Sequence, residues 1–199
     1  TENLIIAASR AKGETILSNC AIEPEIQDLI NFLNKMGCKI EWLGKRKIRI
    51  LGVKNFKKIN YSIMFDRIEA GTMLIAGALI KGNLKIKKIK PRVIKTEIDI
   101  LKKIGVKVKI LNNQINVSGG RKIKNINITT APYPGFPTDL QAQIMVLLCT
   151  ANKDSTIKEK IFENRFMHVS ELNRLGAKIK IINDTAYILG NQKFIGAQV

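Results

Sequence analysis

The residue best suited to acid–base chemistry is Asp139, at the end of the segment TAPYPGFPTD that spans residues 130–139. Three of the five prolines lie in this segment, so its backbone is stiff and could hold a side chain in a fixed direction. Thr138 and Gln141 have the spacing of a capping box, which predicts a helix start with Asp139 in its first turn. A carboxylate there could be a general base or could only complement the helix dipole, and these residues alone leave both interpretations open.

A second candidate segment, ENRFMH, covers residues 163–168. Arg165 could present two N–H donors to a carboxylate or a phosphate, and an ordinary salt bridge is the alternative. His168 is the only histidine, and a single histidine on a helix is more often structural than catalytic. The sequence shows no glycine-rich phosphate loop, nucleophile elbow or metal-spaced cluster, so we expect neither a metal nor a cofactor.

Both segments belong to the third copy of an internal repeat, which has to position them. Three similar stretches carry it: LNKMGCKIEW from Leu33, LKKIGVKVKI from Leu101 and LNRLGAKIKI from Leu172. Their glycines, at positions 37, 105 and 176, fall 68 and 71 residues apart. Each stretch is followed by a polar turn and a second short strand that ends in glycine. The repeat therefore predicts units of helix, strand, helix, strand, turn and strand.

The pattern within each unit predicts an α/β fold. Apolar residues recur at helical spacing from Pro24 to Gly37, and after each repeat glycine they alternate with lysine, as in strands with one solvated face. The segments 4–8, 73–80 and 144–149 are apolar almost all round, so we expect helices that are enclosed on every side. Three such units would place their sheets outside and these helices at the centre.

Composition narrows the class of protein. The chain has 199 residues, 45% of them hydrophobic, which is enough for a globular core. Its longest purely apolar stretch, residues 73–80, is far shorter than the roughly 20 residues that a membrane span needs. No signal peptide is visible, and the three cysteines contain no C-x-x-C pair, so we expect a cytoplasmic protein in a reducing compartment.

The net charge of +18 raises the alternative of a nucleic-acid binder. The sequence contains 33 Ile, 26 Lys and 17 Asn, a bias that AT-rich codons would produce whatever the protein binds. Aromatic residues make up only 6%, which leaves few side chains on which bases could stack. We therefore favour coding bias over a nucleic-acid surface.

Four longer strings carry a specific resemblance. They are APYPGFPTDLQAQ (residues 131–143), IFENRFMHVSELNRLGAKI (161–179), EPEIQDLINFLNKMGCKI (23–40) and DRIEAGT (66–72). The chain resembles the enolpyruvyl transferase family through essentially all its residues, in particular the members that act on UDP-N-acetylglucosamine. Members that act on shikimate phosphate resemble these strings much less.

The resemblance implies a fold of six βαβαββ units in two domains, each an inverted, inside-out α/β barrel like that of EPSP synthase. About three units are present here. Residues 1–65 would be the C-terminal part of the first domain, and residues 66–199 would be two units of the second. Because the chain begins within an apolar helix and without Met, we expect it to be a piece of a longer polypeptide.

The resemblance also implies an activity, in which the enolpyruvyl group of phosphoenolpyruvate moves to the 3′-hydroxyl of UDP-N-acetylglucosamine at the first committed step of peptidoglycan synthesis. Asp139 would accept the hydroxyl proton, Thr138 would lie beside the sugar nucleotide, and Ile161 would contact it. Arg165 would counter charge near the phosphate of the tetrahedral intermediate. No membrane partner is implied.

The same resemblance implies that much of the site lies outside these residues. The family's lysine–asparagine pair, the loop with its general-acid cysteine and most arginines that bind phosphoenolpyruvate have no counterpart here. We therefore expect this chain to need the remainder of the enzyme and to be inactive alone. The alternative from another functional class is a non-catalytic relic or binding module that keeps the repeat scaffold.

Overall fold

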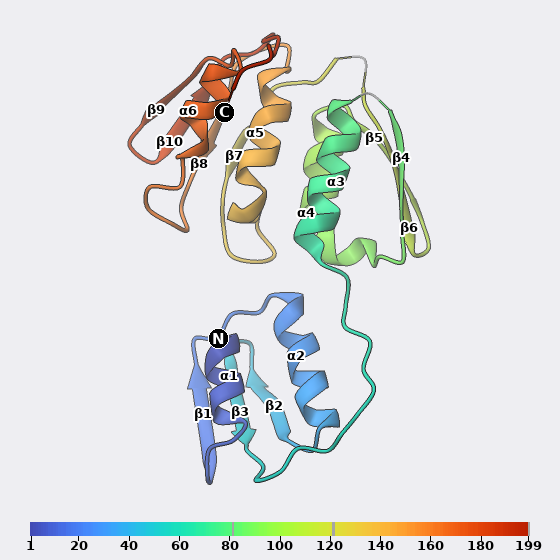
Figure 1. The fold of residues 1–199 in the computed structure, drawn as a ribbon, viewed down its shortest axis with the longest axis vertical. Coiled ribbons are helices and arrows are strands. Elements are labelled where there is room, and N and C mark those ends of the chain that lie inside the picture. The colour runs from blue at the N-terminus through green and yellow to red at the C-terminus, as the bar shows by residue number, and fades with distance from the viewer. Residues whose placement is uncertain (81, 121, 199) are drawn as a thin grey trace. The chain divides into compact units, whose positions relative to one another are not determined.

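The computed structural model describes residues 1–80, 82–120 and 122–198, and it divides into two compact units (Figure 1). The first unit, Thr1–Met64, contains one repeat: α1 (Glu2–Ala8), β1 (Glu14–Ser18), α2 (Pro24–Lys35), β2 (Lys39–Gly44) and β3 (Lys47–Leu51).

The second unit, Phe65–Val199, contains two more repeats. The first of them comprises α3 (Arg67–Leu79), β4 (Asn83–Lys87), the 3₁₀ turn η1 (Pro91–Ile94), α4 (Lys95–Lys103), β5 (Lys107–Leu111) and β6 (Gln114–Ser118). The second comprises β7 (Asn127–Thr129), the 3₁₀ turn η2 (Thr138–Leu140), α5 (Gln141–Cys149), β8 (Ser155–Lys158), α6 (His168–Arg174), β9 (Ile179–Ile182) and β10 (Thr185–Ile188).

Each repeat forms its own open sheet, so the predicted α/β fold of repeated units is confirmed. The strand orders are β1-β3-β2, β4-β6-β5 and β7-β8-β10-β9. Neighbouring strands pair antiparallel except β7 and β8, which are parallel. The third sheet therefore differs from the other two by its added parallel strand, and the proline-rich segment follows directly from that strand.

Local sequence explains the turn from helix to strand in the first and third repeats. Pro24 occupies the first turn of α2, and the helix stops before Gly37, whose φ of +109° favours glycine. The side chain of Asn34 then accepts from Ile40 N and donates to Ile40 O, both at 2.8 Å. Asn173 makes the same pair of bonds to Ile179 in the third repeat. The recurring Leu–Asn of these repeats thus fastens a helix to the strand that follows it.

The prediction of fully enclosed helices is correct for α5 and wrong for parts of α1 and α3. Residues Ile144, Met145, Leu147, Leu148 and Cys149 of α5 are all at most 1% exposed. By contrast, apolar side chains stay exposed on α1 (Leu4, 59%, and Ile6, 51%), on α3 (Met73, 49%) and at the C-cap of α3 (Ile80, 72%). The reason is the packing: α5 contacts α3, β8 and β10, whereas α1 packs against α2 and β3 and leaves a face uncovered.

The start of α5 lies against α3, and the two helices run side by side in Figure 1. A Cβ on Gly71 would come within 2.4 Å of Leu140 Cδ1, so the glycine allows the close approach. A hydrogen bond of 3.0 Å from Gln143 Nε2 on α5 to Thr72 Oγ1 on α3 also joins the two helices. This packing fixes the helix start that carries Asp139.

The lysines predicted on the solvated sheet faces are exposed. Lys107 and Lys109 of β5 are exposed, and they pair with the half-buried residues Ser118 and Asn116 of β6. Among the described helices, none is both long enough and apolar enough to cross a membrane. Cys20, Cys38 and Cys149 are buried and unbonded to one another.

We expect Gly52→Ala to destabilise the first unit by about 1–3 kcal/mol, because the new methyl group would overlap backbone atoms. Val53 N donates to Ser9 O at 2.9 Å, which draws the chain after β3 onto the end of α1. A Cβ on Gly52 would lie 2.6 Å from Ala11 O and 2.8 Å from Ala8 O. Gly44→Ala is the matched control, since its Cβ meets nothing within 4 Å. Thermal unfolding should show a lower midpoint for Gly52→Ala alone, and equal midpoints would contradict the steric argument.

Candidate functional site

Asp139 follows a proline-rich loop that contacts two helices of the preceding repeat. Thr96 Oγ1, on α4, donates to Pro134 O at 2.6 Å, and the guanidinium of Arg67, on α3, lies 5.8 Å from the ring centre of Tyr133. Asp139 follows in η2, directly before α5. The loop is thus held by the neighbouring repeat before it delivers the carboxylate to the helix start.

The predicted capping box is wrong. Pro137 and Leu140 occupy the N-cap positions of η2 and α5, and neither makes a side-chain capping bond. Thr138 Oγ1 and Gln141 Nε2 both donate to Glu159 Oε2, at 2.8 and 2.6 Å. Both side chains are thus turned toward the buried carboxylate, whose charge strengthens the bonds that it accepts, and not toward the backbone N–H groups that a capping box would satisfy. Asp139 still lies in a first turn, as expected, but that turn is 3₁₀.

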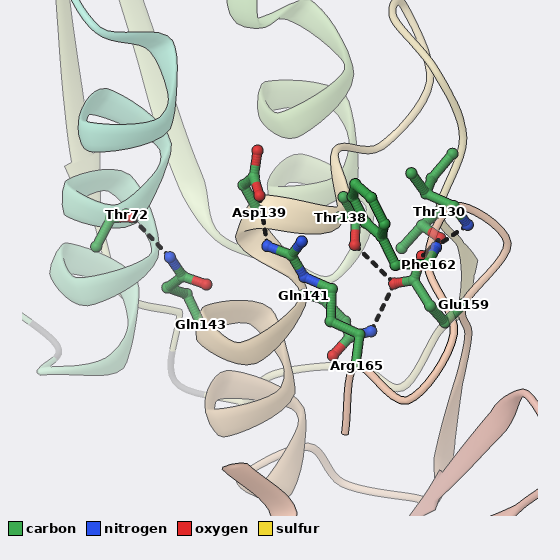
Figure 2. A network of polar contacts seen from close by, with 10 residues as sticks. Thr72, Thr130, Thr138, Asp139, Gln141, Gln143, Glu159, Phe162 and Arg165 are labelled. Atoms are coloured by element: carbon green, nitrogen blue, oxygen red, sulfur yellow. Dashed lines mark hydrogen bonds and ion pairs between the residues drawn. The ribbon is translucent and has the colours of Figure 1, made fainter. Parts of the chain in front are cut away.

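Arg165 and Asp139 form an ion pair, although 26 residues separate them in the sequence. Arg165 Nη2 lies 2.5 Å from Asp139 Oδ1, and Figure 2 shows the guanidinium directed at the carboxylate. The guanidinium carbon also lies 5.1 Å from the ring centre of Phe162. The Asp139 side chain is 51% exposed and that of Arg165 is 37% exposed, so a ligand could reach both. An exposed pair of this kind contributes little to stability.

Glu159 is the residue that the sequence analysis missed. It follows β8 directly and is only 4% exposed. Its Oε1 accepts from Thr130 Oγ1 (2.8 Å), Ile161 N (2.8 Å) and Phe162 N (3.2 Å), in addition to the two bonds at Oε2. Figure 2 shows this carboxylate between the loop of Thr130 and the turn of Thr138.

Burial by itself raises the pKa of Glu159, but the hydrogen bonds from Ile161 N, Thr130, Thr138 and Phe162 N outweigh it and leave the pKa below its ordinary value. Glu159 is therefore ionised at neutral pH. In the sequence it sits between two lysines, Lys158 and Lys160, where it resembles an ordinary solvated charge. The only available signal was its place between a strand and the polar segment that holds Arg165.

The other predicted residues lie next to the same network. Thr138 is 8% exposed and directs its hydroxyl to Glu159, and Ile161 is half-buried with its backbone N–H bonded to Glu159 Oε1. His168 is half-buried, and among the described residues its Nε2 has no hydrogen-bond partner. Burial lowers the pKa of His168, and the charge of Arg165 lowers it further, so the ring is neutral at neutral pH.

Two related enzymes match the chain over its whole length. It is 66% identical over 199 residues to the UDP-N-acetylglucosamine 1-carboxyvinyltransferase of Pelagibacter ubique, and 50% identical over the same length to the enzyme of that name from Geotalea uraniireducens. Each match takes in 100% of this chain and 48% of the relative. The chain thus spans about half the length of the curated relatives it matches.

A solved structure shows the same fold. The enolpyruvyl transferase NikO from Streptomyces tendae superposes on 93% of this chain with a TM-score of 0.83, using 44% of its own length, at 23% sequence identity. The sequence model described as EPSP synthase (3-phosphoshikimate 1-carboxyvinyltransferase) matches residues 1–199. The chain therefore belongs to the EPSP synthase (3-phosphoshikimate 1-carboxyvinyltransferase) family, in agreement with the resemblance found in its sequence.

Proposed function

We propose that this chain is part of an enzyme that transfers the enolpyruvyl group of phosphoenolpyruvate to the 3′-hydroxyl of UDP-N-acetylglucosamine. The observation that carries the proposal is the exposed pair of Asp139 and Arg165 at the start of α5. The names of the two relatives, at 66% and 50% identity, supply the substrate class. The reaction would begin peptidoglycan synthesis and so serve cell-wall growth, cell shape and division in the cytoplasm.

In the proposed first step, the 3′-hydroxyl oxygen forms a bond to the enol carbon that bears the phosphate. Asp139 accepts the hydroxyl proton, while an acid elsewhere in the protein gives a proton to the methylene carbon. The resulting tetrahedral intermediate then loses phosphate as its C–O bond breaks and a methyl proton leaves. Arg165 stabilises the negative charge near the departing phosphate and orients the Asp139 carboxylate.

Thr138 and Ile161 belong to the same proposal as contacts of the sugar nucleotide. Glu159 holds Thr138 by its hydroxyl and Ile161 by its backbone N–H, so each can present a defined surface to a ligand. The acid and the groups that bind phosphoenolpyruvate would come from the remainder of the enzyme, so we propose that the chain is inactive alone. In this scheme residues 1–65 complete one domain and residues 66–199 supply two units of the other.

We expect Asp139→Asn to lower kcat by at least about 10²-fold in a full-length protein that carries this chain, because the amide cannot accept the proton. Phosphate release from phosphoenolpyruvate in the presence of UDP-N-acetylglucosamine measures the rate. Asp99→Asn is the matched control: its side chain is 53% exposed and pairs with Lys95 within α4. Near-normal turnover by Asp139→Asn would refute the base assignment. A wild-type protein that releases no phosphate would favour the binding module.

Arg165→Ala should lower kcat by about 10²-fold while the KM for UDP-N-acetylglucosamine changes by less than about threefold, because the guanidinium acts on charge that develops during the reaction. Arg174→Ala removes another exposed arginine, which pairs with Glu171 on α6, and it should leave both constants unchanged. Steady-state kinetics of the two variants measure the difference. If Arg165→Ala behaved like Arg174→Ala, Arg165 would be a structural ion-pair partner.

A further inference from the structure

We propose that Glu159 is a positioning residue that fixes Asp139 and Arg165 relative to each other without touching the substrate. The inference rests on the function proposed above, because it assigns Glu159 a part in that site. Its basis is geometric: the two carboxylate oxygens of one buried side chain bind two different chain segments, and each segment carries one member of the exposed pair.

One oxygen of Glu159 fastens the segment that carries Asp139. Oε2 accepts from Thr138, the residue before Asp139, and from Gln141, two residues after it. Thr138 and Gln141 are 8% and 1% exposed, so both bonds are shielded from water. The 3₁₀ turn between them is therefore clamped on either side of the one residue whose side chain faces outward.

The other oxygen fastens the segment that carries Arg165. Oε1 accepts the backbone N–H groups of Ile161 and Phe162, at 2.8 and 3.2 Å. Phe162 in turn lies under the guanidinium of Arg165, so a shift of this backbone would move the surface on which the guanidinium rests. Thr130 Oγ1 also donates to Oε1 and accepts from Lys160 N at 2.8 Å, which ties in the start of the proline-rich loop.

The arrangement needs a carboxylate rather than an amide. Its five partners within the described residues are all neutral donors, and an ionised carboxylate is the side chain that accepts at both oxygens. A glutamine would turn an N–H₂ group toward at least two of those donors. It keeps the volume of Glu159, so Glu159→Gln loosens one segment from the other without opening a cavity.

Loss of this fixed arrangement should lower kcat, since misplacement of catalytic groups by about 1 Å can lower the rate 10²-fold. We expect Glu159→Gln, in a full-length protein that carries this chain, to lower kcat by about 10–100-fold with KM changed by less than about threefold. Glu159→Asp keeps the charge but is one methylene too short to span both segments, so it should recover only part of the rate. Glu171→Gln, a carboxylate 45% exposed on α6, is the control and should match the wild type.

A double-mutant cycle with Arg165→Ala separates positioning from a general structural role. If Glu159 acts through the pair, Glu159→Gln should lower kcat by a factor at least about threefold smaller in the Arg165→Ala background than in the wild type, and the remaining effect comes from the turn of Asp139. If Glu159 only stabilises the fold, it should lower kcat by the same factor in both backgrounds, which would overturn the proposal. Unchanged kcat in a folded Glu159→Gln protein would overturn it as well.

Hydrogen exchange tests the clamp without relying on activity. In Glu159→Ala, which removes both acceptor oxygens, the amides of Ile161 and Phe162 should exchange at least about tenfold faster than in the wild type, whereas the amides of β10 should not change. Unchanged exchange at Ile161 and Phe162 would refute the clamp even if the protein is an enolpyruvyl transferase. An inactive wild-type protein that nonetheless shows the exchange difference would refute the proposed function and leave the clamp standing.

Discussion

The candidate site depends on a negative charge that is kept away from water. A carboxylate as buried as Glu159 loses most of its hydration, and that loss is tolerable only when other donors replace the water. Here two hydroxyls, two backbone amides and one side-chain amide converge on it. Removing any one of them would leave the charge undersolvated, so the segments that bring these donors are constrained together. The carboxylate therefore acts as a cross-link between these segments. It holds them firmly because no water is available to replace a lost donor.

This cross-link occurs where the third repeat departs from the first two. Those repeats enter their second helical segment through Pro24 and Pro91, which need no partner for a backbone N–H at the first turn. The third repeat has the polar stretch around Arg165 at that place, and the amides of the two residues before this stretch, Ile161 and Phe162, are bonded to Glu159. The third sheet also gains the parallel strand β7, which leads to the proline-rich loop. The candidate site therefore lies where the third repeat differs most from the other two.

The repeat itself could be predicted from the sequence because its signals are local. Helical spacing after Pro24, a positive φ at Gly37 and alternating lysines depend on residues a few positions apart. The role of Glu159 could not be predicted this way, because its donors come from residues up to 29 positions distant. The capping box at Thr138 failed for the same reason: a local pattern competed with a buried charge that only the fold brings near. The exposed faces of α1 likewise depend on what packs there, which apolar periodicity does not encode.

The two carboxylates of the candidate site, Asp139 and Glu159, differ in burial and therefore in how easily they exchange partners. Asp139 and Arg165 are partly exposed, so water screens their attraction, and either can exchange its partner for a ligand at little cost. Glu159 is shielded, and its five bonds have no solvent to replace them, so it cannot exchange partners without a large penalty. The proposed reactive pair has to be both accessible and correctly aligned, and these two properties come from different residues. The chain meets that requirement by exposing the exchangeable charges on two segments, one with Asp139 and one with Arg165, and by burying the fixed charge that is bonded to both segments.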